Sequence, residues 1–263
     1  MPFRMSALAT LGVVTLSLAA TRPAAEVHVM ISAGYFPVYA ELGPAFERAT
    51  GDRLVTSRGP STGDSPEAIP ARLLRGEIAD VVILDAEAAD ELGRRGLVRP
   101  ETKVELASSV IGMVVRAGAA RPEIGSVDAF RRTLLAAKSI AYSDSSSGTY
   151  LSTVLFPRLG VADQIAGRCR KVRGPPSGEP VAAVVARGEA EIGFQQVSEL
   201  IHVPGTVFVG TLPAEIQKVT VSAAVLTRSA KEPEAAQALI RLLTSREAEA
   251  AILRAGLTPV TRH

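Results

Sequence analysis

One continuous apolar run constrains the fold of this chain more than any other feature. The run ADVVIL, residues 79–84, follows a helical pattern at 66–77 and precedes another at 86–96. Every position of the run except Asp80 is apolar, and an apolar strand without alternation is typical of a parallel sheet whose two faces are both covered by helices. This arrangement predicts a protein of the α/β class.

The alternation of strand and helix patterns continues along the chain. Further strands are predicted at 26–32, 53–58, 103–115, 139–144, 191–196, 207–213 and 219–227. Further helices are predicted at 35–51, 126–138, 145–161, 179–190 and 231–256. Within the first of these helices, Pro44 predicts a break or bend, because proline lacks the N–H that a helix interior uses.

Two segments far apart in the sequence resemble each other. LLRGEIADVVIL (73–84) and VVARGEAEIGFQQ (184–196) each contain an apolar helix end, then Arg-Gly-Glu, then a strand. Each glycine can end its helix in a left-handed conformation. The match is either the coincidence of a common turn or the mark of two similar lobes. We interpret it as two lobes with a ligand cleft between them.

The expected division follows from this interpretation. Residues 26–112 and 220–263 are assigned to lobe 1, and residues 113–219 to lobe 2. Strands near 112–118 and again near 207–226 would then carry the chain between the lobes.

The N-terminus has the pattern of a secretory signal peptide. Arg4 supplies a positive charge, and Ser6 to Ala20 form an apolar stretch of suitable length. The signal is assigned to residues 1–25, with cleavage between about 19 and 25. A membrane anchor needs about 20 apolar residues, more than this run contains. The single cysteine, Cys169, is compatible with export, and the expected location is the periplasm.

Composition and motifs exclude several classes of function. The net charge is +2 without a basic run, and aromatic residues are only 4% of the chain, so no nucleic-acid partner is expected. No phosphate-binding loop, nucleophile elbow or metalloprotease motif is present. The three histidines are far apart in the sequence, so neither a metal site nor a cofactor is expected.

Four strand-to-helix segments are rich in serine, threonine and glycine. They are SAGYF (32–36), SRGPSTGDS (57–65), SDSSSGTY (143–150) and SGEP (177–180). Helix starts and hydroxyl groups favour anions, although serine is also an ordinary helix cap. Four such segments over two lobes predict a site for a small anion.

These features resemble a known family. SAGYFPVYAELGPAFERATG, RGEIADVVIL and VVARGEAEIGF are similar to the type 2 periplasmic binding-protein fold, in its molybdate-binding-protein-like branch. The resemblance covers about residues 27–260. It implies two Rossmann-like lobes, a two-strand hinge, closure around a ligand and, by default, a monomer.

The expected ligand differs from molybdate. Ser32 and Ser61 occupy the serine segments of the resemblance, but Gln196 stands where molybdate binders carry a tyrosine. Arg58 adds a cation that those binders lack, and a guanidinium suits a carboxylate. With Gln195, these residues favour a larger organic anion, a polycarboxylate.

Longer strings are similar to a subgroup that includes bacterial aconitate isomerase. They are GPSTGDSPEAIPARLLRGEIADVVI, SSSGTYLSTVLFPRLG and GEPVAAVVARGEAEIGFQQ. The resemblance implies an allylic proton shift between cis- and trans-aconitate. Further donors to the ligand would then be Thr62, Ser147, Gly148 and Thr149.

The sequence contains no unique base for that reaction. Tyr35, Tyr150 and Glu179 are candidates because each lies in a predicted ligand loop. The alternative function needs no base: a solute-binding protein would deliver an organic acid or a molybdate-like oxyanion to an ABC-type permease.

Overall fold

The computed structural model describes residues 23–63 and 65–260. Most of the expected signal segment, residues 1–22, lies outside the described residues. None of the helices in the described part of the chain has the length and apolar character needed to cross a membrane.

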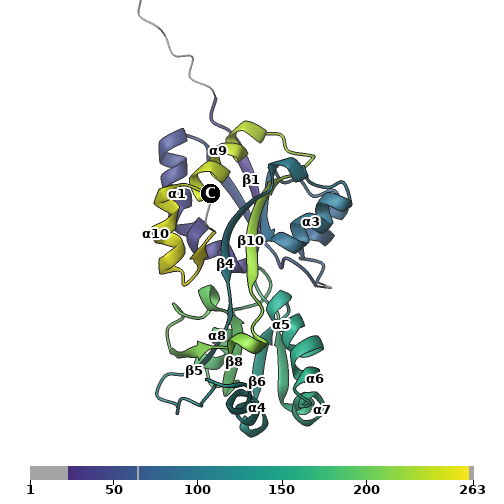
Figure 1. Ribbon diagram of the computed structural model, residues 1–263. Helices are drawn as coiled ribbons and strands as arrows, with labels where there is room; N and C mark the ends of the chain where they lie inside the picture. Colours follow the sequence, from purple (N-terminus) through teal and green to yellow (C-terminus); the bar gives the residue numbers. More distant parts are fainter. Residues whose placement is uncertain (1–22, 64, 261–263) are drawn as a thin grey trace, which may run out of the picture.

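The described residues form two α/β lobes, stacked one above the other in Figure 1. Lobe 1 consists of β1 (Glu26–Ile31), α1 (Phe36–Thr50), β2 (Arg53–Arg58), α2 (Ile69–Leu74), β3 (Val81–Asp85), α3 (Ala86–Arg94), β4 (Val104–Ser109), β10 (Thr220–Leu226), α9 (Pro233–Leu243), α10 (Arg246–Arg254) and β11 (Thr258–Pro259). Lobe 2 consists of β5 (Ile111–Arg116), α4 (Val127–Ala136), β6 (Ile140–Ser143), α5 (Ser146–Tyr150), α6 (Phe156–Arg158), α7 (Ala162–Ile165), β7 (Cys169–Val172), α8 (Val181–Ala186), β8 (Ile192–Gln196) and β9 (Thr206–Thr211). A π-helical turn, Leu151–Leu155, joins α5 to α6.

Each lobe is built on one mixed sheet. The strand order is β11-β4-β10-β3-β1-β2 in lobe 1 and β7-β6-β8-β5-β9 in lobe 2. Strands β2, β1 and β3 are parallel, as are β7, β6 and β8, and the remaining strands are antiparallel to their neighbours. The predicted α/β class and the two-lobed architecture are confirmed.

The chain crosses between the lobes in two places. The first crossing is at Val110, between β4 and β5, which is nearer the N-terminus than the expected start of lobe 2 at residue 113. The second lies at 212–219, between β9 and β10, and β10 begins at the expected residue 220. Strands β4 and β10 pair antiparallel and lie side by side, β4 leading into lobe 2 and β10 leading back from it (Figure 1).

The helix–turn–strand joints of the two lobes have the same hydrogen bonds. After α2, Gly76 has a φ of 81°, and after α8, Gly188 has a φ of 78°. The N–H of the following glutamate, Glu77 or Glu189, donates to the carbonyl five residues earlier in each case. This Schellman pattern requires the left-handed backbone that glycine adopts most easily. The sequence match is therefore a structural match.

Helix α1 has no break at Pro44, one of the two alternatives predicted there. The helix continues through this residue to Thr50. Pro44 removes the N–H that would bond to Ala40, but both residues are exposed, so water can bond to the carbonyl that is left over. An exposed proline can therefore be accommodated without ending the helix.

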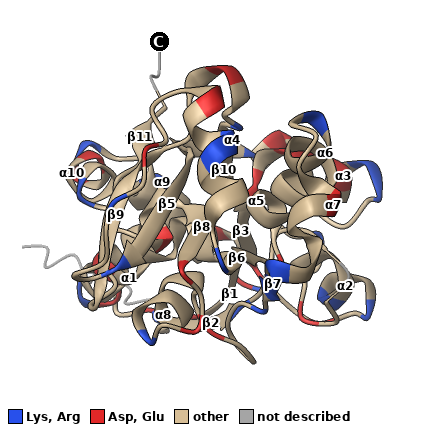
Figure 2. Ribbon diagram, turned by 90° about the horizontal axis from the view of Figure 1, so that it is seen from below, with Lys and Arg blue, Asp and Glu red and all other residues tan. Residues whose placement is uncertain are grey.

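The apolar run at 79–84 is buried on both faces, as predicted. Val81 and Ile83 pack into the core beneath α1, α9 and α10, whereas Val82 and Leu84 pack into the core on the side of α2 and α3. Charges of both signs lie on the outer helices and loops, and the central strands β5, β6 and β8 carry little charge (Figure 2).

Asp80 connects three distant segments of lobe 1. This residue has no exposed surface. Its carboxylate accepts hydrogen bonds from the backbone N–H groups of His28 at 2.7 Å, Lys231 at 2.6 Å and Glu232 at 2.9 Å. The aspartate therefore holds β1 and the turn before α9 to the start of β3.

Replacing Asp80 by alanine should destabilise the protein by about 3 kcal/mol, because three backbone N–H groups lose a buried carboxyl acceptor. Urea unfolding followed by circular dichroism measures the change. The control is Asp163→Ala at the exposed first turn of α7, which should cost no more than about 1 kcal/mol. Equal losses for the two variants would contradict the structural role of Asp80.

Candidate functional site

A cleft between the lobes collects the polar ends of several strands. The empty space between its walls, counting the open mouth, is about 510 Å³. Lobe 1 contributes Ser32, Ala33, Gly34, Arg58, Gly59, Pro60, Ser61 and Asp85. Lobe 2 contributes Ser143, Asp144, Ser145, Ser146, Ser147, Gly174, Pro175, Gln195, Gln196 and Glu199.

Arg58 provides a half-buried positive charge in this cleft. It is the last residue of β2, and its guanidinium lies over the Phe36 ring at 4.0 Å from the ring centroid. Its Nε is buried and has no hydrogen-bond partner among the described residues. Burial lowers the pKa of Arg58 and the nearby Glu199 raises it, but a guanidinium stays charged in proteins. A cation with an unsatisfied donor is suited to an anionic ligand.

Asp85 holds hydroxyl groups from both lobes. It ends β3, and its carboxylate accepts from Ser61 Oγ at 2.9 Å and from Ser146 Oγ across the cleft. Ser146 also shares a 3.1 Å hydrogen bond with Thr62 of lobe 1. Burial raises the pKa of Asp85, and the bonds from the two serines partly oppose this. Asp85 thus connects the two lobes at the cleft.

Glu199 is a second partly buried carboxyl group in the cleft. It ends a short 3-10 turn, Val197–Glu199, directly after β8. Its Oε2 accepts a hydrogen bond from the side-chain amide of Gln195. Burial raises the pKa of Glu199 to about 8, Arg58 opposes this rise, and the carboxylates of Asp85 and Asp144 add to it. Glu199 is therefore mostly protonated at neutral pH.

The two glutamines at the end of β8 are buried. Gln195 accepts from the N–H of Val181 at 3.1 Å, which fixes its amide. Gln196 donates to Thr220 Oγ1 at 3.1 Å, and its buried Oε1 has no partner in the part of the chain that the structure describes. Gln196 therefore keeps one acceptor for a ligand or a water.

A protein-family model identifies the family to which this chain belongs. The model described as bacterial extracellular solute-binding protein matches residues 27–258. The chain belongs to this family.

A curated relative and two solved structures are similar to this solute-binding protein. An aconitate isomerase from Pseudomonas sp. is 44% identical over 254 residues, which are 97% of this chain and 95% of the relative. The periplasmic molybdate-binding protein of Azotobacter vinelandii is 21% identical with a TM-score of 0.70, covering 90% of this chain and all of the other. The sulfate-binding protein of Mycobacterium tuberculosis is 20% identical with a TM-score of 0.69, covering 90% of this chain and 87% of the other.

The structural likeness confirms the type 2 periplasmic binding-protein fold that the sequence strings predicted. At these identities the two solved structures show the fold alone. The fold places the carboxyl ends of β1, β2 and β3 opposite those of β6 and β8, which is where α/β sheets bind ligands.

Most of the predicted ligand residues of this solute-binding protein meet in the cleft. The six that line it are Ser32, Arg58, Ser61, Ser147, Gln195 and Gln196. Thr62 is not part of the lining, but its hydroxyl shares a hydrogen bond with Ser146, which is. At Gly148, a Cβ would come 1.7 Å from the carbonyl oxygen of Ser143, so this glycine allows α5 to start against β6.

Thr149 is outside the cleft. It lines a separate surface hollow beside Lys171 and Arg173. The prediction that Gly148 and Thr149 donate to the ligand therefore has no support from their placement, because α5 turns these positions away from the cleft lining.

The three predicted proton-transfer residues are engaged elsewhere, which corrects the sequence expectation. Tyr35 is fully buried, and its hydroxyl donates to the carbonyl of Leu243 at 3.1 Å. The hydroxyl of Tyr150 donates to the carbonyl of Ile216 at 3.0 Å. Neither tyrosine belongs to the cleft lining.

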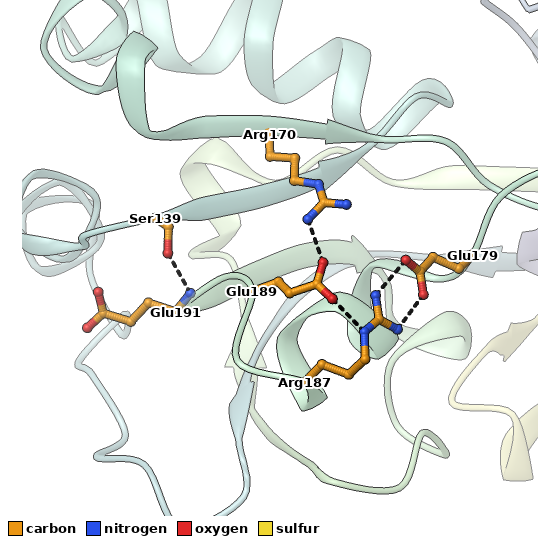
Figure 3. A network of polar contacts seen from close by, with 6 residues as sticks. All are labelled: Ser139, Arg170, Glu179, Arg187, Glu189 and Glu191. Atoms are coloured by element: carbon orange, nitrogen blue, oxygen red, sulfur yellow. Dashed lines mark hydrogen bonds and ion pairs between the residues drawn. The ribbon is translucent and has the colours of Figure 1, made fainter.

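Glu179 lies on the outer surface of lobe 2. Both of its carboxylate oxygens accept from Arg187, at 2.6 and 2.7 Å, and Arg187 also pairs with Glu189 (Figure 3). The hydrogen bonds from Arg187 lower the pKa of Glu179, which makes it a weaker base.

The cleft contains three acidic residues that the sequence analysis did not select. They are Asp85, Asp144 and Glu199. Asp85 and Asp144 directly follow strand patterns, so their positions at strand ends were a usable signal. Glu199 follows its strand by three residues in VSEL, and only the packed structure shows that its side chain faces the cleft.

The pKa of Glu199 predicts a pH dependence of stability. Between about pH 5 and pH 8 the folded protein keeps a proton on Glu199 that the unfolded chain releases, so the free energy of unfolding falls as the pH rises. Glu199→Gln removes this effect. Urea unfolding should show the variant gaining stability relative to the wild type between about pH 5 and pH 9.

A matched control is Glu215→Gln, an exposed glutamate in another 3-10 turn. Its stability difference from the wild type is measured over the same pH range. If the difference for Glu199→Gln varies with pH no more than that of the control, the raised pKa is contradicted.

Proposed function

We propose that this protein is a periplasmic aconitate isomerase. The observation that carries the proposal is the half-buried Arg58, whose Nε has no partner, in a cleft otherwise lined by hydroxyls, amides and carboxyls. The 44% identity with an aconitate isomerase over nearly the whole chain supports it.

The chemistry of the cleft favours a carboxylate ligand. A guanidinium left unpaired away from water is costly, and a carboxylate can accept two parallel N–H bonds from it. Ser32 and Ser147 add hydroxyl groups around the same space, whereas the Ser61 hydroxyl already donates to Asp85. A ligand with several carboxylates can contact Arg58 and these serines at once, so a polycarboxylate fits this set of donors.

The proposed reaction moves one proton and one double bond. A proton leaves the methylene carbon of trans-aconitate, the double bond shifts by one carbon, and a proton is added to the former vinyl carbon. The negative charge of the intermediate spreads over the allyl unit and the attached carboxylates. Arg58 and the serine hydroxyls are suited to stabilise that charge.

Periplasmic location is part of the proposal. The family description is extracellular, and the signal-like segment at residues 1–25 supports export. Ala25 is buried in lobe 1, its N–H donates to Asp52, and its carbonyl accepts from Arg53. Cleavage after Ala25 would remove this packing, so we place the cleavage site before Ala25.

A second candidate function is transport binding without catalysis. It is favoured by the family and by the molybdate- and sulfate-binding structures that share the fold. In that case the same cleft would hold an organic acid or oxyanion for an ABC-type permease, as a monomer. The two functions differ in whether the ligand leaves chemically changed.

The first test is turnover. The purified protein lacking the signal segment should convert trans-aconitate to cis-aconitate and the reverse, as followed by chromatography and ¹H NMR. Heat-denatured protein is the control. Tight stoichiometric binding of another anion without conversion of aconitate would refute the isomerase function and support transport.

The second test concerns Arg58. Arg58→Ala should weaken trans-aconitate binding by about ten- to a hundredfold, since a charge-assisted hydrogen bond contributes roughly 1.5–3 kcal/mol. Isothermal titration calorimetry measures the affinity. Arg48→Ala, which changes an exposed arginine on α1 of the same lobe, should leave affinity within about twofold. An unchanged affinity for Arg58→Ala would rule out the proposed carboxylate contact.

A further inference from the structure

We infer that Glu199 is the catalytic residue that removes and returns the proton in the isomerisation. This inference rests on the proposed function. Three observations carry it: the position of Glu199 in the cleft, its hydrogen bonding, and the arrangement of the other ionisable groups around it.

Glu199 and Arg58 approach the cleft from opposite lobes. Arg58 ends β2 in lobe 1, and Glu199 ends the turn after β8 in lobe 2. The two side chains are close enough to interact electrostatically. A ligand carboxylate held by Arg58 therefore brings the adjacent carbon atoms toward Glu199 when the lobes are closed. A base has to reach the carbon next to a carboxylate in this reaction.

The carboxyl group of Glu199 has a free oxygen. Oε2 accepts from Gln195, whose own carbonyl is fixed by Val181, so the orientation of the carboxyl is defined. Within the described residues, Oε1 has no protein donor among the hydrogen bonds of this group. That oxygen can take up a proton from a ligand carbon. The arrangement orients the base and leaves it reactive.

The other acids of the cleft are less suited to the role. Asp85 uses one oxygen for Ser61 and the other for Ser146. Asp144 accepts from the N–H of Gly174 at 3.1 Å and lies at the cleft margin, where it also borders a second hollow. Among the described residues that line the cleft, no histidine, lysine, tyrosine or cysteine is present.

The groups that face Glu199 set its basicity. Arg58 of β2 favours the carboxylate form, whereas Asp85 at the end of β3 and Asp144 after β6 disfavour it. With a pKa of about 8, roughly a tenth of Glu199 is ionised at pH 7. A ligand carboxylate on Arg58 offsets its positive charge and makes Glu199 a stronger base.

Glu199 alone can perform both proton transfers. The Glu199 carboxylate takes the proton from the methylene carbon, and the C–H electron pair enters the allyl system. The protonated Glu199 then gives the proton to the far carbon, and the double bond forms at the new position. The carboxylate is regenerated, and no other reactant is needed.

The test compares Glu199→Gln and Glu199→Asp with the control Glu215→Gln. We measure turnover of trans-aconitate, its dissociation constant by calorimetry, and exchange of its methylene protons in D₂O by ¹H NMR. Glu199→Gln should lose at least about a hundredfold in kcat and in exchange, the lower range of general acid–base catalysis. Its dissociation constant should stay within about threefold of the wild type. Glu199→Asp should keep intermediate activity.

The pH profile provides a readout that a structural role would not affect. The kcat/KM of the wild type and of Glu215→Gln should rise toward a plateau above about pH 8, because the base must be ionised. The residual activity of Glu199→Gln should lack this rise.

Each outcome separates the inference from the proposed function. A wild type that turns over aconitate together with a Glu199→Gln variant within about threefold of it overturns the role of Glu199 alone. Loss of affinity with unchanged kcat makes Glu199 a binding residue and also overturns it. A wild type with neither turnover nor methylene exchange overturns the proposed function and the role of Glu199 with it.

Discussion

Desolvation of ionisable groups between the two lobes is the physical constraint on which the electrostatics of the cleft depend. Arg58, Asp85 and Glu199 share one cleft, and burial disfavours the charged form of each. Neither lobe alone would enclose these groups. Closure of the lobes therefore creates the electrostatic environment of the site.

The contacts that hold the lobes together at the cleft are polar. Asp85 and Thr62 of lobe 1 both bond to Ser146 of lobe 2. At the rim, Ser177 donates to Glu67 at 2.6 Å, and on the hinge side Ser198 donates to the carbonyl of Gly34 at 2.7 Å. Water can replace such contacts at low cost when the lobes separate. The interface is thus compatible with opening and closing about the two crossings, which is a known mode of ligand capture.

Local patterns were sufficient to predict the fold and the strand ends. The run at 79–84 predicted a strand buried on both faces, and the Arg-Gly-Glu joints predicted paired lobes, because both depend on neighbouring residues in the chain. Arg58 and Gln196 could be predicted for the same reason, since each ends a strand of a parallel sheet. The direction of a loop was not predictable in this way.

For the proton-transfer candidates, the sequence did not predict which way each side chain points. Tyr35 and Glu179 lie in loops that run past the cleft, but the tyrosine turns into the core and the glutamate pairs with Arg187 outside. Glu199 has no local signal, because a short turn after β8 can direct its third residue to either side. Burial and charge partners at such positions depend on the packing of both lobes.

The acidic residues of the cleft help to decide whether the protein only binds its ligand or also converts it chemically. A site adapted only to hold a polyanion gains from donors and cations, and each nearby carboxyl group weakens it through repulsion or desolvation. Asp85 offsets that cost by joining hydroxyls of both lobes. Glu199 joins no hydroxyls of the two lobes: among the described residues, its side-chain hydrogen bond is the one from the neutral amide of Gln195. A carboxyl group that weakens anion binding and holds no structure together is better explained by a reaction that needs its proton.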